Sequence, residues 1–532
     1  MSLIEITLVL LLVIAVVGAI GKRVQIPLPL LQVAAGIGLS YLPAFRSLSF
    51  PPEIFFLLFI PPLLFADGWL IPKRDLLLVI RPVLLLAFGL VLLTVVAVGY
   101  LVHWLVPELP LAAAFALGAV VSPTDAVAVT AITDRLAVPT RVTTIVGGES
   151  LINDASGLIA FKFAIAAVAT GVFSWSAAAI DFVLLSGGGL LVGLALAWIA
   201  SQVRVYLQRF CIDDPSIQTI ISLLTPYAAY FAAERLGLGS ILAVVAAGLF
   251  AGVSDARNAD AATRRHSWEV WTMLLYVLNG LVFLLLGVQL HSVIGGIPHA
   301  DAYGLSLLAL MVAAAVILLR LAWVSPFLLS RRLRETDGIY QPRHVFLVGW
   351  AGIRGAVTLA AAFSIPLATA GGEPFPGRDL IIFLAASVIV ITFVLHGLTL
   401  PLFIRWLGVR GDGVAAREER AARLAAAQAA TTALRQELPR LTDPGELAYA
   451  HSLIAEYERH IERHSANAER RTQVNALHDA ERRLRLAAVR AERTELLQLH
   501  DDEVINDEVL RLIQADLDHV ESLLTGSGDR RA

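Results

Sequence analysis

Five ionisable side chains stand inside stretches of this 532-residue sequence that are otherwise apolar: Asp125, Glu149, Asp154, Arg320 and Arg354. An ionisable residue near the centre of a bilayer costs at least about 2.5 kcal/mol on insertion scales, so such residues usually serve a function. Carboxylates can bind a cation or a proton, and buried arginines can neutralise carboxylates or helix ends. The sequence therefore places its chemistry inside apolar segments.

One predicted helix carries acidic and hydroxyl side chains over residues 147–155. At about 100° per residue, Ser150 and Asp154 share one face of that helix. Together with the side chain or the backbone carbonyl of Thr124, they can offer oxygen ligands to a small alkali cation, which prefers oxygen to nitrogen or sulfur. We therefore expect a Na+ site at Asp154, Ser150 and Thr124.

The neighbouring face of the same helix carries Glu149 and Asn153. We expect this face to hold the helix in place against a basic neighbour. Arg320 is the buried base outside the glycine-rich interruptions, and leaving either charge unpaired would be severely unfavourable. The sequence therefore predicts that Glu149 pairs with Arg320.

The chemistry of Asp154 follows from its surroundings. Burial in a poorly solvated cavity disfavours the charged form of a carboxylate, so a proton can compete with a cation for the same oxygens. If the protein reorients only when Asp154 holds one or the other, exchange of cation for proton is compulsory. The sequence thus favours an antiporter.

Two predicted spans are interrupted by polar or helix-breaking residues. Pro123 precedes Asp125 in the middle of one span, and residues 349–355 read Gly-Trp-Ala-Gly-Ile-Arg-Gly in another. Broken helices present partial charges at their ends, so we expect Asp125 near N-terminal ends and Arg354 near C-terminal ends. The structural alternative for both residues is a buried ion pair.

The elements that must position these residues are membrane spans. The chain is 57% hydrophobic and 16% charged, with a mean hydropathy of +0.73. A span needs about 20 mainly apolar residues, which predicts thirteen helices near residues 3–20, 25–43, 52–66, 76–103, 111–132, 143–170, 180–201, 216–235, 238–254, 268–289, 303–328, 344–368 and 379–404. We therefore expect an all-α polytopic membrane protein.

The two interrupted spans are the fifth and the twelfth of this series. Their odd offset makes them antiparallel, as expected for inverted repeats, and paired broken helices indicate a midplane site in a secondary transporter. Basic residues in the loops place the N-terminus outside and the residues from 405 onward in the cytoplasm. We expect the plasma membrane, specifically a bacterial inner membrane.

The sequence changes character at residue 405. Residues 1–404 form the predicted membrane domain, and residues 405–532 are rich in charge, with amphipathic segments near 414–437, 445–470, 473–499 and 503–524. This tail fits a helical or coiled-coil domain that packs on itself or on a second subunit, with a ligand sensor as the alternative. The net charge of −3 and the single cysteine indicate no nucleic-acid binding and no internal disulfide.

Five further polar residues are weaker candidates for the ion site: Lys162, Glu53, His396, Asp67 and Asp75. Lys162 lies about 12 Å beyond Asp154 and fits a snorkelling or pathway-lining lysine. His396 could titrate near neutral pH but fits a packing histidine better. Glu53 is expected to face water or a dimer contact, and Asp67 and Asp75 fit funnel or surface charges.

Four motifs carry a resemblance to a known family: Ser122-Pro-Thr-Asp-Ala-Val-Ala-Val129, Gly148-Glu-Ser-Leu-Ile-Asn-Asp-Ala155, Phe283-Leu-Leu-Leu-Gly-Val-Gln289 and Gly349-Trp-Ala-Gly-Ile-Arg-Gly-Ala356. In this order and spacing they closely resemble the first family of monovalent cation:proton antiporters, the sodium/proton exchangers of the NhaP and NHE type. The resemblance covers essentially the whole membrane part and implies the NhaA-like fold with two crossed broken helices.

The resemblance also implies how the molecule works. It implies a homodimer with a scaffold of spans one to three and seven to ten, and an elevator-like core of spans four to six and eleven to thirteen. Asp154 is implied as the ion-binding residue, with Ser150, Thr124 and Asp125 as co-ligands or supports. Asn153 is implied as the structural partner of Asp154, and this Asn-Asp pair implies electroneutral exchange of one cation for one proton.

Alternatives remain within and beyond this function. An antiporter with the same fold and site could prefer K+ or Li+ to Na+, because the identity of the ligands does not determine the size of the cation-binding cavity. A cation channel or uniporter would use Asp154 only to attract ions, and a membrane sensor would use the tail as its output. No enzymatic triad, phosphate loop or redox site is visible, so we expect neither covalent catalysis nor a cofactor; the expected partners are monovalent cations, protons and lipid.

Overall fold

The computed structural model describes residues 3–24, 26–46, 51–133, 136, 138–171, 175–210, 214–295, 297, 302–329, 341–369, 372–411, 413–465 and 468–526. Regular secondary structure in these residues is helical, apart from one isolated bridge between Ala368 and Pro374. The chain divides into two compact units, residues 1–412 and 413–532. Each unit is considered by itself.

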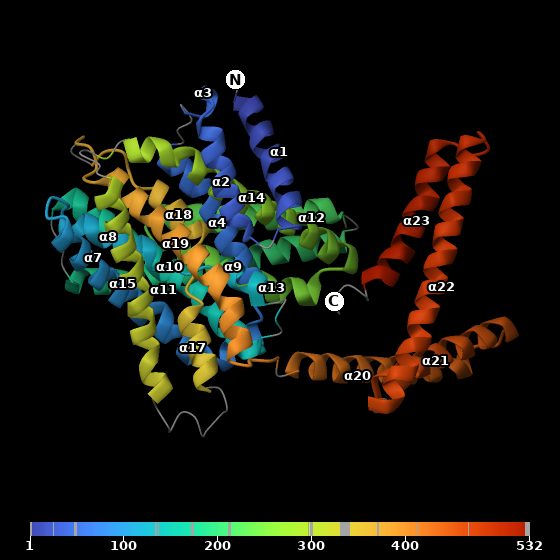
Figure 1. Ribbon diagram of the computed structural model, residues 1–532. Coiled ribbons are helices and arrows are strands. Elements are labelled where there is room, and N and C mark those ends of the chain that lie inside the picture. Colours follow the sequence, from blue (N-terminus) through green and yellow to red (C-terminus); the bar gives the residue numbers. More distant parts are fainter. Residues whose placement is uncertain are drawn as a thin grey trace. The chain divides into compact units, whose positions relative to one another are not determined.

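Unit 1 is a bundle of apolar helices (Figure 1). Its elements are α1 (Leu3–Gly21), α2 (Leu28–Ser40), α3 (Pro43–Arg46), α4 (Pro52–Leu70), α5 (Lys73–Leu78), α6 (Ile80–Leu84), the π-helix η1 (Leu85–Leu90), α7 (Val91–Leu105), α8 (Leu111–Val121), α9 (Ala126–Thr133), α10 (Thr140–Thr170), α11 (Trp175–Arg209), α12 (Pro215–Arg235), α13 (Ser240–Asn258), α14 (Ala261–Gly295), α15 (Ala302–Leu329), α17 (Pro342–Trp350), α18 (Ala356–Phe363) and α19 (Arg378–Trp406). The thirteen stretches predicted as spans coincide with these helices or with consecutive groups of them.

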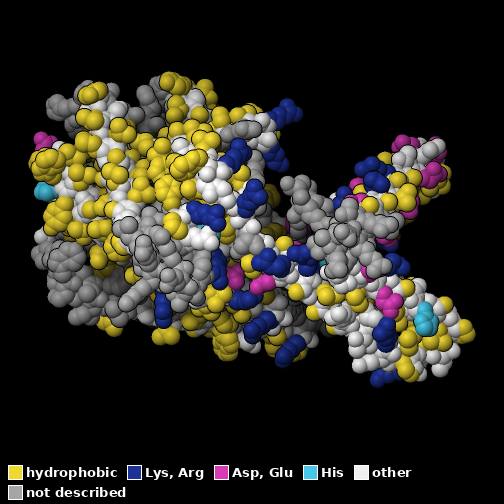
Figure 2. Space-filling view, turned by 60° about the horizontal axis from the view of Figure 1, so that its bottom comes forward, with side chains coloured by type: hydrophobic (Ala, Val, Ile, Leu, Met, Phe, Trp, Pro, Cys, Tyr) yellow, Lys and Arg dark blue, Asp and Glu magenta, His cyan; other side chains and the backbone are white. Residues whose placement is uncertain are grey.

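The lengths and surfaces of these helices suit a bilayer. Among the described residues, nine helical segments are long and apolar enough to cross a membrane, and α2 and α8 are shorter apolar helices. Large apolar side chains also lie on the outside, with Leu77 and Leu191 each 70% exposed. Figure 2 shows hydrophobic side chains over much of the described surface of unit 1. Such a surface is stable against lipid and unstable in water.

Small residues let the helices approach closely. A Cβ atom on Gly36 of α2 would overlap with the Leu284 carbonyl of α14, and one on Gly287 of α14 would overlap with the Val33 carbonyl of α2. The backbones of α2 and α14 therefore touch at paired glycines. This is a common way to pack helices in lipid, where the hydrophobic effect does not drive association.

The fourth predicted span differs from its expected form. The sequence predicts an unbroken helix over 76–103, whereas the structure breaks it at Val79 and inserts a π-helix at Leu85–Leu90. Pro82 explains why a new helix begins here, since proline lacks a backbone donor and fits the first turn of a helix. Ser156 of α10 donates a hydrogen bond of 2.5 Å to the Ala87 carbonyl within the π-helix.

The two predicted interruptions are present. Residues 122–125 separate α8 from α9, and residues 351–355 separate α17 from α18. In both places an apolar helix stops, a few residues run without helical hydrogen bonds, and a second short helix begins. Backbone groups freed in this way need other partners in a membrane.

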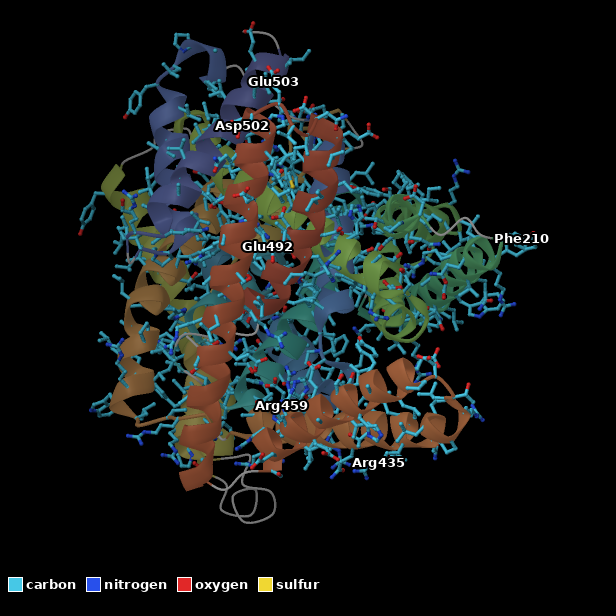
Figure 3. All side chains as sticks on the ribbon, turned by 90° about the vertical axis from the view of Figure 1, so that its right-hand side faces the viewer. Phe210, Arg435, Arg459, Glu492, Asp502 and Glu503 are labelled. Atoms are coloured by element: carbon cyan, nitrogen blue, oxygen red, sulfur yellow. The ribbon has the colours of Figure 1, made fainter. Side chains whose placement is uncertain are left out.

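Unit 2 consists of helices with mostly polar surfaces: α20 (Val414–Glu437), the 3-10 helix η3 (Leu438–Arg440), α21 (Pro444–Ser465), α22 (Ala468–Asp501) and α23 (Asp507–Gly526). Val489 and Leu496 of α22 pack with Leu517 of α23 in a small apolar seam. Charged side chains such as Arg435, Arg459 and Glu492 lie on its surface (Figure 3). The predicted segments 414–437 and 503–524 overlap with α20 and α23, whereas the predicted boundary between segments 445–470 and 473–499 falls inside α22. Residues 466–467 and 527–532 lie outside the described residues.

Candidate functional site

The two helix interruptions of unit 1 contact each other directly. The Asp125 backbone N–H donates a hydrogen bond of 2.7 Å to the Ile353 carbonyl, although the two residues are more than 200 positions apart. Arg354 Nε donates one of 3.0 Å to the Val121 carbonyl, the last residue of α8. Each interruption thus supplies partners for backbone groups that the other leaves free.

Arg354 lies where helices end. It is 1% exposed, and its guanidinium donates to the carbonyl of Val121, the last residue of α8, and to that of Gly352, two residues after the end of α17. Its backbone N–H donates to Thr392 Oγ1 of α19 at 3.3 Å. A positive charge at two C-terminal helix ends neutralises their partial negative charges.

Asp125 lies where helices begin. Its carboxylate accepts a hydrogen bond of 3.2 Å from the Ala128 N–H in the first turn of α9, as a capping residue does. A Cβ atom on Gly355, the residue before α18, would overlap with the same carboxylate. The half-buried Asp125 therefore faces the N-terminal ends of α9 and α18.

Thr124 is held by α10 from two sides. Ser150 Oγ donates to the Thr124 carbonyl at 2.6 Å and accepts from the Ala126 N–H at 3.2 Å. Asn153 Nδ2 donates to Thr124 Oγ1 at 2.8 Å. The hydroxyl of Thr124 thus faces Asn153, whereas its carbonyl faces Ser150.

Asp154 is the buried carboxylate of this region with an unused oxygen. It is 3% exposed, and its Oδ1 atom has no hydrogen-bond partner among the described residues. It follows Asn153 on α10, so it lies next to the residues that hold Thr124. A buried anionic oxygen is strongly unfavourable without a counter-charge, so a cation or a proton would stabilise it.

Glu149 and Arg320 form the ion pair that the sequence predicts. Both side chains are 1% exposed, and both guanidinium nitrogens at the tip of Arg320 donate to the Glu149 carboxylate, Nη2 to Oε2 at 2.7 Å. Arg320 also donates to the carbonyls of Val348 and Gly349, at 2.9 and 3.1 Å. The arginine therefore joins α10, α15 and the last turn of α17.

Asp67 of α4 is a residue that the sequence ranked too low. It is half-buried, and its carboxylate is close enough to those of Asp125 and Asp154 for their charges to interact. A funnel or surface position was predicted for Asp67 because the residue lies near the end of its span. Its place in the helix, with apolar residues on either side, was the signal that could have raised its rank.

The other lower-ranked residues lie outside the group of carboxylates formed by Asp67, Asp125 and Asp154. Lys162 lies further along α10, where it contacts Ser240 of α13 and the rings of Phe56 and Tyr230. His396 is buried and packs edge-on against Trp350, with ring centroids 5.1 Å apart. Glu53 is exposed in the first turn of α4, and Asp75 is half-buried in α5.

The candidate site lies within a region that matches a known protein family. Residues 9–406 match the family described as the transmembrane sodium/hydrogen exchanger. The chain belongs to this family. As a member of the first family of monovalent cation:proton antiporters, it belongs to a family of multi-pass membrane transporters.

Relatives match over most of their length. A sodium, potassium, lithium and rubidium/H+ antiporter of Bacillus pumilus is 39% identical, covering 98% of this chain and 78% of its own. A protein of Escherichia coli named as an uncharacterised Na+/H+ exchanger is 38% identical, covering 97% of this chain and 98% of its own. The match therefore includes the C-terminal tail as well as the membrane part of this exchanger-family chain.

A solved structure shares the fold. The sodium proton antiporter of Methanocaldococcus jannaschii has a TM-score of 0.60 and 19% sequence identity to this chain, covering 76% of it and 98% of the archaeal protein. At this identity the likeness concerns the fold of the exchanger-family membrane unit. The predicted antiporter-like fold class is confirmed at that level.

Proposed function

We propose that this protein exchanges Na+, or a closely related monovalent cation, for H+ across the membrane, with both ions competing for Asp154. The observation that carries the proposal is the buried Oδ1 atom of Asp154, which has no hydrogen-bond partner among the described residues. A cation and a proton are alternative ways to neutralise that carboxylate. Obligatory competition for one group links the two fluxes.

The proposed cation ligands come from two elements. Asp154 and Ser150 share a face of α10, and the Thr124 carbonyl lies 2.6 Å from Ser150 Oγ. The Thr124 hydroxyl is already bound to Asn153, so we assign the backbone carbonyl rather than the hydroxyl to the cation. Asp125 supports the site from the helix interruption, together with the structural residues Asn153, Glu149, Arg320 and Arg354.

The architecture supports alternating access. The interrupted helices α8–α9 and α17–α18 fall in the fifth and twelfth predicted spans, and their contact supports inverted repeats within thirteen spans. We assign spans one to three and seven to ten to a dimerisation scaffold, and spans four to six and eleven to thirteen to a core that moves as an elevator. The core includes the proposed cation ligands Asp154, Ser150 and Thr124, whereas Asp67 lies on α4 of the scaffold.

The proposal extends to location and stoichiometry. The basic loops favour an outside N-terminus and a cytoplasmic tail in a bacterial inner membrane. Asn153 rather than an acid precedes Asp154, so this position of α10 supplies one carboxylate rather than two. This supports electroneutral exchange of one cation for one proton.

A potassium-preferring antiporter is the second candidate. Oxygen ligands accept several alkali cations, and the Bacillus pumilus relative is named for four of them. A channel or uniporter is the contrasting class, because it would carry net current without moving protons in exchange. Cation choice and coupling are therefore the two quantities to measure.

The test is proton movement in proteoliposomes that contain the purified full-length protein. Sodium, lithium or potassium gradients are imposed with the membrane voltage clamped at zero and then varied. The variants are Asp154→Asn and, as a matched control, Glu53→Gln, which changes an exposed acid to its amide. We expect exchange in the wild type and the control, independent of voltage, and its loss in Asp154→Asn.

Each other outcome rejects a stated part of the proposal. Full exchange by Asp154→Asn rejects that residue as the shared site. A strong dependence on voltage rejects one-for-one exchange, and the cation series decides between Na+ and K+. Cation flux without proton movement in the wild type rejects antiport and favours a channel.

A further inference from the structure

Lys162 occupies an unusual position for a lysine in a membrane helix. It lies on α10, eight residues or about 12 Å beyond Asp154, yet its ammonium contacts three other helices. Lys162 Nζ donates to Ser240 Oγ of α13 at 3.3 Å, and lies 5.9 Å from the Phe56 ring of α4 and 5.8 Å from the Tyr230 ring of α12.

These contacts form a small cage for a cation. Phe56 and Tyr230 pack together with ring centroids 6.1 Å apart, and an ammonium within about 6 Å of a ring centroid is attracted to the ring face. Tyr230 also donates a hydrogen bond of 3.2 Å to Glu234, whose negative charge reaches Lys162. Lys162 is an exposed residue, but its ammonium lies against Ser240 and the two rings, whereas a snorkelling lysine would extend toward water or lipid headgroups.

The cage joins two groups of helices that the proposed function separates. In that function, α10 belongs to the moving core, whereas α4, α12 and α13 belong to the scaffold. We propose that Lys162 is a positioning residue that latches α10, and with it Asp154, to the scaffold in the conformation seen here. This inference rests on the proposed elevator motion, and it adds a contact that each transport cycle must break.

The latch has a measurable size. Removing the charge removes the cation–π contacts with both rings and the charged donor of the hydrogen bond to Ser240. Loss of the charge is expected to change the ratio of the latched to the unlatched conformation by about tenfold, which equals 1.4 kcal/mol at 25 °C. Such a shift moves populations without removing the ion site.

The test measures the distance between α10 and α12 by pulsed electron spin resonance of the full-length protein in nanodiscs. Cys211, the single cysteine of the chain, is replaced by serine, and spin labels are placed at Thr170 and Arg235 near the ends of the two helices. Distances are recorded with and without Na+ at several pH values. The variants are Lys162→Met, Lys162→Gln and Lys162→Arg.

Lys162→Met keeps the apolar stem and removes the charge, so we expect the about tenfold change in the ratio of the two distances. Lys162→Gln keeps a donor for Ser240 without the charge and should shift the ratio nearly as far, which also serves if the methionine variant fails to fold. Lys162→Arg should restore the wild-type ratio. Lys22→Met, the same change at an exposed lysine, is the control.

Two results overturn the latch. Equal distance ratios in the wild type, Lys162→Met and Lys162→Gln show that the cage does not stabilise either conformation. A single distance in every sample shows that α10 does not move relative to α12, which also removes the elevator. The exchange function fails separately, when wild-type proteoliposomes move no protons, so the two failures are distinguishable.

Discussion

Removing Arg320 should destabilise the protein far more than neutralising its partner Glu149. In Arg320→Met the Glu149 carboxylate stays buried without a counter-charge, and the carbonyls of Val348 and Gly349 lose their donor. In Glu149→Gln the arginine keeps both carbonyls and an amide oxygen as acceptors. The two variants therefore leave unequal numbers of buried groups without partners.

The magnitude follows from the burial of the pair. Both side chains are 1% exposed, and breaking such a pair by removing one partner costs about 3–5 kcal/mol. We expect a loss in this range for Arg320→Met and about 1–3 kcal/mol for Glu149→Gln, where one charge keeps polar partners. The double variant should recover part of the loss of Arg320→Met, because no carboxylate then remains unpaired.

The free energy of unfolding can be measured by titrating SDS into mixed micelles and following tryptophan fluorescence, since the chain has nine tryptophans. The double-mutant cycle isolates the coupling between the two residues. The reasoning is refuted if Arg320→Met unfolds at the wild-type SDS fraction, or if the double variant is less stable than Arg320→Met by the full cost of Glu149→Gln.

Two further predictions concern backbone space and a titrating lysine. Gly355→Ala should abolish exchange in proteoliposomes, because its Cβ would overlap with Asp125, whereas Gly147→Ala, which adds a methyl to open space, should not; equal activities contradict this. Burial lowers the pKa of Lys73, between the spans of α4 and α7, to about 8. Amine acylation followed by mass spectrometry should therefore label Lys73 with a midpoint near pH 8, below the ordinary lysine value of about 10.4; a midpoint at the ordinary value contradicts it. Because the folded state releases this proton at lower pH than the unfolded chain, stability should rise between about pH 8 and 10.4 and Lys73→Met should remove that rise.

Much of the fold could be predicted because lipid imposes local rules. Apolar runs of sufficient length and the paired interruptions at Pro123 and at residues 349–355 are visible in the sequence. The π-helix at Leu85–Leu90 was missed, since nothing in its apolar composition distinguishes it from an α-helix. The local sequence pattern predicts the presence of a helix more reliably than it predicts the arrangement of the helix's hydrogen bonds.

In the candidate site too, some contacts could be predicted from the sequence and others could not. The Glu149–Arg320 pair could be predicted because a buried charge requires a partner and few were available. The contact of Asp125 with Ile353, and the approach of Asp67 to Asp154, depend on how distant segments pack. Lys162 was placed on the right helix. The rings of Phe56 and Tyr230 around it come from two other helices that are distant in the sequence, so the residues next to Lys162 could not predict these contacts.

The different roles of Glu149 and Asp154 follow from the placement of one arginine. Both carboxylates are almost fully buried on α10, but among the described residues Glu149 has a salt-bridge partner and Asp154 has none. Arg320 is directed to Glu149, because both Nη atoms donate to that carboxylate while Nε and Nη2 also donate to the carbonyls at the end of α17. A fixed positive charge at Asp154 would satisfy it permanently and exclude mobile ions. By directing Arg320 to Glu149, the fold provides the rigidity of a buried ion pair, and in the proposed function this leaves the Asp154 carboxylate to be neutralised by a mobile cation or proton.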